Sequence, residues 1–198
     1  MTDLTLREIR YKEKKRKILK KAANLFAKKG YEKATIEEIA AGLKLNKASL
    51  YHYVGSKEEL LYRIQVQALD QTNEALDRVL ESELDSVEKL REILRSHVEI
   101  ATKEPVIQTL RQQEFILPPK WRDKVIAKRN RFERGFMRLI QDSVEHGAFD
   151  NKDWKVPARA ILGAMYWIPW WYSRNGEFTP EEISDAMTTF IVRGLFPK

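Results

Sequence analysis

The residues from 35 to 59, TIEEIAAGLKLNKASLYHYVGSKEE, constrain the fold of this chain more than any other stretch. They contain three helix-start signals, in each of which a small polar side chain caps the backbone N–H of the residue three positions later. A glutamate at that later position returns a hydrogen bond to the cap and completes a capping box. The stretch therefore predicts three helix starts joined by short connections. The signals are Thr35 with Glu38, Asn46 with Ser49, and Ser56 with Glu59.

The helix predicted after Asn46 has an unusual composition for a packed helix. Residues 47–53, KASLYHY, are too few to be stable alone and offer mostly polar groups and aromatic hydroxyls. The helix before it is also short, with a single apolar face over about two turns. Two short helices joined by a tight turn, the second presenting polar groups, are typical of a helix-turn-helix.

The net charge of +7 is concentrated near this pattern. Residues 1–60 carry 15 Lys and Arg against 8 Asp and Glu, whereas residues 61–198 carry 21 of each. The excess cations therefore coincide with the predicted helix-turn-helix, which indicates a module that binds a polyanion. Two interpretations of the cations in residues 10–17 stay open: phosphate contacts beside a groove, or a solvated basic arm whose first ten residues are partly disordered.

Composition argues against several classes of protein. The chain has no cysteine, which excludes disulfides, thiolate metal sites and cysteine nucleophiles. No apolar stretch reaches 18 residues and the N-terminus is charged, so we expect a cytoplasmic protein with no membrane span. The three histidines are scattered, and no nucleophile elbow, phosphate loop or HExxH motif occurs. We therefore expect no enzymatic activity, no metal site and no cofactor.

Helical periodicity continues to the end of the chain and predicts an all-α fold of about nine helices. The eighth is apolar nearly all round, and Pro169 within it is expected to kink it or open its hydrogen-bond ladder. The predicted domains are residues 1–55, carrying the helix-turn-helix, and residues 56–198, for ligand binding and dimerisation. The predicted helices lie at about 7–29, 36–43, 47–53, 57–81, 85–105, 106–116, 119–146, 154–174 and 179–194.

Residues 10–62 resemble the DNA-binding end of TetR-type transcriptional regulators. The segments that carry the resemblance are ILKKAANLF, KASLYHY and GSKEEL, with Gly30-Tyr31, Ala34-Thr35 and Ile39-Ala40 between the first two. Val54 departs from the family, which commonly has Phe there, and this change is expected to alter packing rather than DNA contact. The rest of the chain resembles the family mainly in helix count and layout, and its end, WYSRNGEFTPEEISD followed by GL, is similar to members that respond to acyl-CoA thioesters.

The resemblance implies a homodimer in which the last two helices of each subunit form a four-helix interface. It also implies repression as the usual mode of regulation. The residues agree with such an interface, because Ala160, Gly163 and Ala164 allow close helix approach and the last helix has an apolar stripe. The alternative is that both helices simply pack on their own core.

The third helix is expected to enter the major groove, where base edges carry a distinguishing pattern of donors and acceptors. Lys47, Ser49 and His52 are the candidates on its exposed face, while Leu50, and with it Ala48, is placed inward. The resemblance implies backbone contacts at the remaining positions, although Thr35 has N-capping and Tyr51 has partial packing as alternative roles. The full predicted DNA-binding set is Thr35, Lys47, Ala48, Ser49, Tyr51, His52 and Lys57.

Aromatic residues concentrate in the second half of the chain, beside an arginine-rich seventh helix. The aromatic side chains are either core filler or the wall of an apolar cavity between helices four to eight. The arginines are either a solvated face or a receptor for an anionic head group. An acyl-CoA would suit both features, and a lipophilic drug or a steroid-like acid would suit the aromatics. The predicted ligand-binding set is Trp121, Arg129, Phe132, Phe136, Trp167 and Trp171.

The sequence thus predicts a ligand-responsive transcriptional regulator, a repressor by family habit, that binds double-stranded operator DNA as a homodimer. A small hydrophobic or amphipathic effector would release it. The alternative is a basic helical protein that binds lipids or small molecules without specific DNA binding. The cations gather near short capped helices rather than along an amphipathic stripe, which favours the DNA-binding interpretation.

Overall fold

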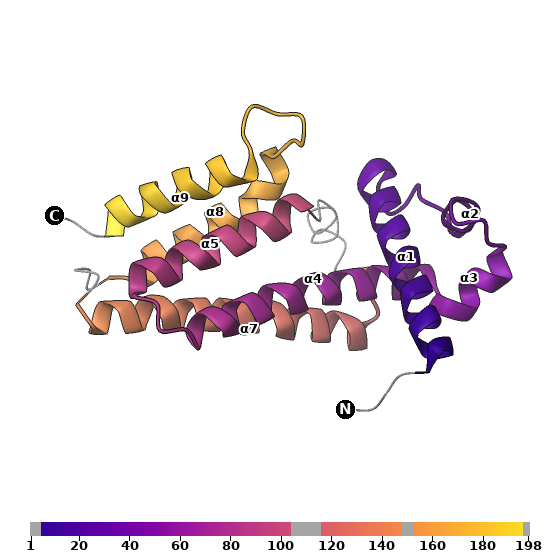
Figure 1. Ribbon diagram of the computed structural model, residues 1–198, viewed down its shortest axis with the longest axis horizontal. Helices are drawn as coiled ribbons and strands as arrows, with labels where there is room; N and C mark the ends of the chain where they lie inside the picture. Colours follow the sequence, from indigo (N-terminus) through magenta and orange to yellow (C-terminus); the bar gives the residue numbers. More distant parts are fainter. Residues whose placement is uncertain (1–4, 104–115, 148–152, 196–198) are drawn as a thin grey trace. The chain divides into compact units, whose positions relative to one another are not determined.

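The computed structural model describes residues 5–103, 116–147 and 153–195, and within these ranges the fold is all-α, as predicted. The predicted helix at 106–116 falls almost wholly outside the described residues. The other helices appear in the predicted order (Figure 1). They are α1 (Leu6–Lys29), α2 (Ile36–Ala41), α3 (Lys47–Val54), α4 (Lys57–Leu80), α5 (Ser86–Lys103), α7 (Pro119–Glu145), α8 (Lys155–Trp171) and α9 (Pro180–Leu195).

The chain forms two compact units. The first combines Met1–Gln67 with Val106–Val125, and the second combines Ala68–Pro105 with Ile126–Lys198. Helix α4 contributes its first half to one unit and its second half to the other. No described helix is both long and apolar enough to cross a membrane.

The first unit is organised by the predicted helix starts, all three of which form. The Asn46 side chain accepts a hydrogen bond from the N–H of Ser49 at 2.7 Å, and Ser56 Oγ accepts one from Glu59 at 3.0 Å. Between α3 and α4 the chain turns at Gly55, whose φ of 44° lies in the region that glycine tolerates best. The apolar faces of α1 to α4 meet in one core. It includes Ile18, Ala22, Phe26, Ile39, Leu50, Val54, Leu60 and Leu61.

The second unit has its own core, formed by helices α4, α5, α7, α8 and α9. Gly135 lets α7 approach α4 closely, because a β-carbon at this position would overlap the side chain of Leu76. The core includes Leu76, Leu90, Ile93, Leu94, Phe132, Phe136, Leu139, Ile140, Leu162 and Met165.

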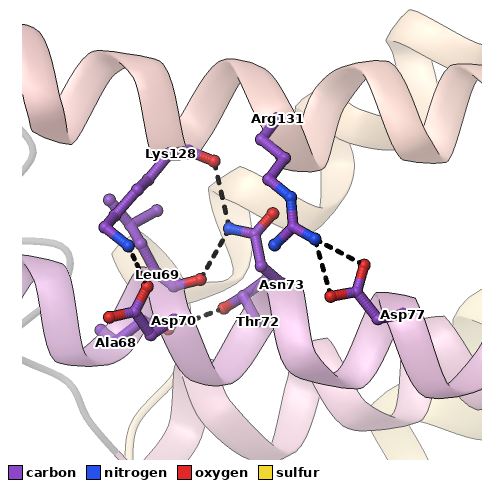
Figure 2. A network of polar contacts seen from close by, with 8 residues as sticks. All are labelled: Ala68, Leu69, Asp70, Thr72, Asn73, Asp77, Lys128 and Arg131. Carbon is purple, nitrogen blue, oxygen red and sulfur yellow. Dashed lines mark hydrogen bonds and ion pairs between the residues drawn. The ribbon is translucent and has the colours of Figure 1, made fainter.

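A polar clasp joins α4 to α7 inside the second unit (Figure 2). Asn73 is almost completely buried, and its amide donates to the carbonyls of Leu69 at 2.8 Å and Lys128 at 3.1 Å. On either side an aspartate of α4 forms an ion pair with a cation of α7. These pairs are Asp70 with Lys128 and Asp77 with Arg131. Because a buried amide is costly unless it is bonded, Asn73 fixes the register of the two helices.

Helix α8 continues through Pro169 and ends two residues later, before the predicted end. Pro169 has no N–H to give to the carbonyl of Met165, its usual partner four residues back. That carbonyl instead lies 3.1 Å from Nε2 of His97, on α5. The predicted opening of the hydrogen-bond ladder is therefore confirmed, and a side chain from another helix fills it.

Candidate nucleic-acid interface

Helix α3 has one buried side and one open side. Leu50 and Val54 are buried, while Lys47, Tyr51 and His52 are exposed. The predicted Ser49 is partly exposed. The inward placement of Ala48 was wrong: Ala48 is exposed, because the short helix needs only Leu50 and Val54 to reach the core. The open side is wide enough to present several donors to a groove.

Thr35 begins α2 with a complete capping box. Its hydroxyl oxygen accepts from the N–H of Glu38 at 3.2 Å, and the Glu38 carboxylate accepts from the N–H of Thr35 at 3.1 Å. Lys29 forms an ion pair with the same carboxylate. The N-capping role of Thr35 is therefore present in the structure, and Thr35 is also exposed beside the helix terminus, where an anion would be favoured.

Lys47 is paired rather than free. Its ammonium lies 2.5 Å from the carboxylate of Glu37 on α2 and 6.0 Å from the centre of the Tyr51 ring. The hydrogen bond to Glu37 raises the pKa of Lys47, and the bond from Lys47 lowers the pKa of Glu37. Sequence reasoning missed Glu37, because this pair spans ten positions and a turn, and no local spacing signals it.

Lys57 faces the connection between α1 and α2. Its ammonium donates to the carbonyl of Glu32 at 3.2 Å and lies 4.3 Å from the centre of the Tyr31 ring. Burial is the main reason that the pKa of Tyr31 is raised, with Glu58 and Glu32 adding to the effect. Lys57 thus stabilises the first unit and is only partly exposed. A phosphate that binds its ammonium would have to compete with the Glu32 carbonyl.

The predicted ligand-binding residues belong to both units and differ in burial. Phe132 and Phe136 are buried in the core of the second unit, whereas Trp167 and Trp171 of the same unit are 59% and 46% exposed. Trp121 belongs to the first unit, where its ring stacks on Tyr62 with centroids 5.2 Å apart. Arg129 is partly exposed on α7. Helix α8 is apolar on nearly all sides, so its sequence does not indicate which of these sides packs against the core.

His97 is the polar member of the aromatic core around Phe132. Its ring centre lies 6.0 Å from those of Phe132 and Tyr166, and the Tyr166 hydroxyl donates to Glu133 at 3.2 Å. His97 is partly buried, next to the carbonyl that Pro169 leaves open.

A three-helix head that packs a short, capped helix with its polar side outward defines a helix-turn-helix DNA-binding protein. Two family models match the chain. Residues 18–64 match "Bacterial regulatory proteins, tetR family", and residues 83–195 match "Tetracyclin repressor-like, C-terminal domain". The chain belongs to the TetR family of bacterial transcriptional regulators.

Individual relatives are of the same kind. The TetR family transcriptional regulator PfmR from Thermus thermophilus is 36% identical, with 90% of this chain and 98% of that chain covered and a TM-score of 0.84. AibR, whose structure was solved with isovaleryl coenzyme A and operator DNA, is 30% identical, with 92% and 98% covered and a TM-score of 0.78. The transcriptional repressor KstR2 of Mycobacterium tuberculosis is 24% identical over 181 residues, 90% of each chain. PfmR and KstR2 are named as transcriptional regulators, and AibR was solved with operator DNA.

Proposed function

We propose that this chain is a transcriptional repressor that binds operator DNA as a homodimer and leaves it when a hydrophobic or amphipathic effector binds. The observation that carries DNA binding is the open side of α3. It presents a cation, a hydroxyl and an imidazole within one short helix, on a head that also holds the excess positive charge. These groups match the donors and acceptors of base edges and phosphates.

Within this proposal the predicted residues have distinct roles. His52 and Ser49 read base edges in the major groove, and exposed Ala48 lets the backbone of α3 approach the bases. Tyr51 contacts the phosphate backbone, as do Thr35 at the start of α2 and Lys57 at the start of α4. Lys47 also contacts phosphate, once the DNA competes with Glu37 for its ammonium. All of these residues except Lys57 lie in the domain predicted for residues 1–55.

The partner proposed for α8 and α9 is a second copy of this chain. Val156 on α8 is 71% exposed and Phe190 on α9 is 80% exposed. Trp167, Trp170 and Trp171 of α8 are also exposed, to a smaller fraction. Ala160, Gly163 and Ala164 lie exposed on α8 between them. Large apolar side chains and small residues on an open helix face are typical of a close helix–helix interface. A two-fold axis would cover the same face in both subunits.

The effector class follows from the second unit and from the relatives. AibR was solved with isovaleryl coenzyme A, which joins a short apolar acyl group to a phosphorylated nucleotide, and KstR2 is described as a ketosteroid transcriptional regulator. In this chain a groove between α7 and α8 is lined by Arg134, Arg138 and Arg159 together with Glu133 and Asp142. Its arginines suit the phosphates of an acyl-CoA, and Met137 and Leu162 supply an apolar part of its lining.

The test is a DNA-binding titration with the promoter region next to the protein's own gene. We expect salt-dependent binding with a slope of about −5 for some six phosphate contacts per dimer, because each contact contributes about −0.9. Acyl-CoA thioesters of several chain lengths and steroid acids are then added to the complex. Binding that ignores salt, or that does not distinguish the promoter from random DNA, would contradict the proposal. Release by neither ligand class at saturation would contradict the effector assignment alone.

A further inference from the structure

Helix α1 passes alongside α3, and two contacts fix its register. Tyr11 of α1 stacks on Tyr53, in the last turn of α3, with ring centroids 5.1 Å apart and an interplanar angle of 29°. At the other end, Gly42 precedes α3 and a β-carbon there would overlap the end of the Lys21 side chain. Residues 6–10 of α1 therefore precede the contact with the last turn of α3.

This segment is an ordered helix with almost no core of its own. The first buried residue of α1 is Ile18, yet the helix begins at Leu6, behind a complete capping box of Thr5 and Glu8. Leu6 is 75% exposed. A short, highly charged helical segment is not expected to persist in water without packing. The Tyr11–Tyr53 stack supplies that packing, so residues 6–17 are a positioned helix rather than a free basic arm.

One side of helix α1 carries a row of cations that begins in this segment and continues to residue 21. They recur at i, i+3, i+7, i+10 and i+14, the spacing that places side chains in one row along a helix. Neighbouring like charges in such a row repel one another. Within the described part of the chain no carboxylate pairs with the first four of them. This row, the α1 cation stripe, consists of Arg7, Arg10, Lys14, Lys17 and Lys21.

We propose that the α1 cation stripe binds phosphates of double-stranded DNA that flank the base pairs read by α3. This inference rests on the proposed function. Lys21 lies at the turn before α3, and Arg7 stands four residues, about 6 Å, beyond the Tyr11–Tyr53 contact. That reach corresponds to about two base pairs outside the α3 footprint, at a phosphate spacing of about 3.4 Å along one strand.

The structure favours DNA over an anionic membrane as the partner. A membrane-surface helix needs a broad apolar face opposite its cations. In residues 6–17 the apolar side chains are Leu6, Ile9 and Tyr11, and Tyr11 is occupied by Tyr53. Tyr53 in turn lies edge-on to His52, with centroids 5.7 Å apart, so the stripe is fixed relative to a side chain of the open side of α3. Tyr11 and Tyr53 are the positioning residues of the stripe.

The experiment combines a charge variant with trimmed DNA. The double variant Arg7→Gln/Arg10→Gln removes the end of the stripe, and Lys12→Gln/Arg16→Gln removes two equally exposed cations from another side of the same helix. Affinity is measured for the promoter site in a long duplex and in duplexes trimmed at both outer ends in steps of two base pairs. We expect trimming to weaken the wild type and the control variant but not the stripe variant. The stripe variant should also have a shallower salt slope, by about 0.9 for each phosphate contact that is lost.

Further arms separate the possible failures. Tyr11→Ala should reproduce the insensitivity of the stripe variant to trimming, while Tyr11→Phe, which keeps the stack, should behave as the wild type. Equal loss on trimming for stripe variant and wild type would overturn the inference and leave the proposed function intact. If the wild type binds no promoter DNA, the proposed function itself fails. Loss of binding to vesicles of anionic phospholipid in the stripe variant, with its response to trimming unchanged, would overturn the inference in favour of a membrane.

Discussion

Lys47 is the first residue of the recognition helix, but its ammonium is held across the turn by Glu37. The pair is exposed and places a carboxylate beside the surface that would face a polyanion. Because its hydrogen bond to Lys47 lowers the pKa of Glu37 below its usual value, Glu37 stays ionised at any pH used for DNA binding. Lowering the pH within that range therefore does not free Lys47 from Glu37, whereas a substitution of Glu37 does.

We predict that Glu37→Gln strengthens DNA binding. Lys47 no longer has to leave an ion pair before it contacts a phosphate, and a negative charge beside the DNA is removed, so the affinity should rise. The gain should be a few-fold, since exposed ion pairs are worth about 0–1 kcal/mol. In a Lys47→Met background the same substitution should have a smaller effect, and this double-mutant cycle isolates the pair. A loss of affinity confined to the promoter site would instead show that Glu37 reads a base.

We predict that His52→Ala and Lys57→Ala affect DNA binding in different ways. His52 is exposed on α3, so His52→Ala should change discrimination between operator and mismatched sites by about 1–3 kcal/mol. Lys57→Ala should weaken binding to all sequences similarly and also lower the melting temperature, because Lys57 bonds the Glu32 carbonyl. Titrations against a panel of single-base variants, with melting curves alongside, measure both effects. Uniform weakening by His52→Ala would remove it from base reading.

At the scale of the helices, the features that could be predicted from sequence are those encoded within one turn. The capping signals depend on residues three apart and were confirmed, as was the burial of Leu50, whereas Ala48 is exposed. The clasp at Asn73 and the Tyr11–Tyr53 stack join residues more than 40 positions apart, so no local spacing encodes them. The exposure of Trp167 was missed for another reason: an apolar side chain fits a subunit interface as well as a core.

Pro169 and His97 form one such long-range pair, and we predict that their energies are coupled. His97→Leu should destabilise the chain by about 1–3 kcal/mol, because the Met165 carbonyl then stays buried without a partner. In a Pro169→Ala background the helix can bond that carbonyl itself, so the cost should fall. His97→Gln, which keeps a donor, is the matched control. Denaturant unfolding of the four variants measures the coupling, and additive losses would contradict it.

At the scale of the whole molecule, helix α4 is the element common to the DNA-binding head and the second unit. In the proposed dimer, a shift of α4 would change the distance between two recognition helices, which must match half-sites about 34–36 Å apart. An effector shifts this equilibrium only through its preference for one state. A change from 1:99 to 99:1 needs a preference of about 10⁴-fold. The polar clasp at Asn73 would hold the second half of α4 against α7 during such a change.

If α8 lies in the subunit interface, a substitution on its exposed face should disrupt the dimer without disrupting the single chain. A β-carbon at Gly163 of α8 meets no atom within 4 Å in one chain, so Gly163→Leu should leave the fold of the monomer intact. If α8 packs closely on a second copy, the same side chain collides with the partner helix. We therefore expect the variant to sediment as a folded monomer and to lose at least tenfold in operator affinity, because each half-site is then bound separately. Lys124→Leu, at an exposed position of α7, is the control and should remain dimeric. A Gly163→Leu variant that stays dimeric and binds the operator as the wild type does would place the subunit interface elsewhere.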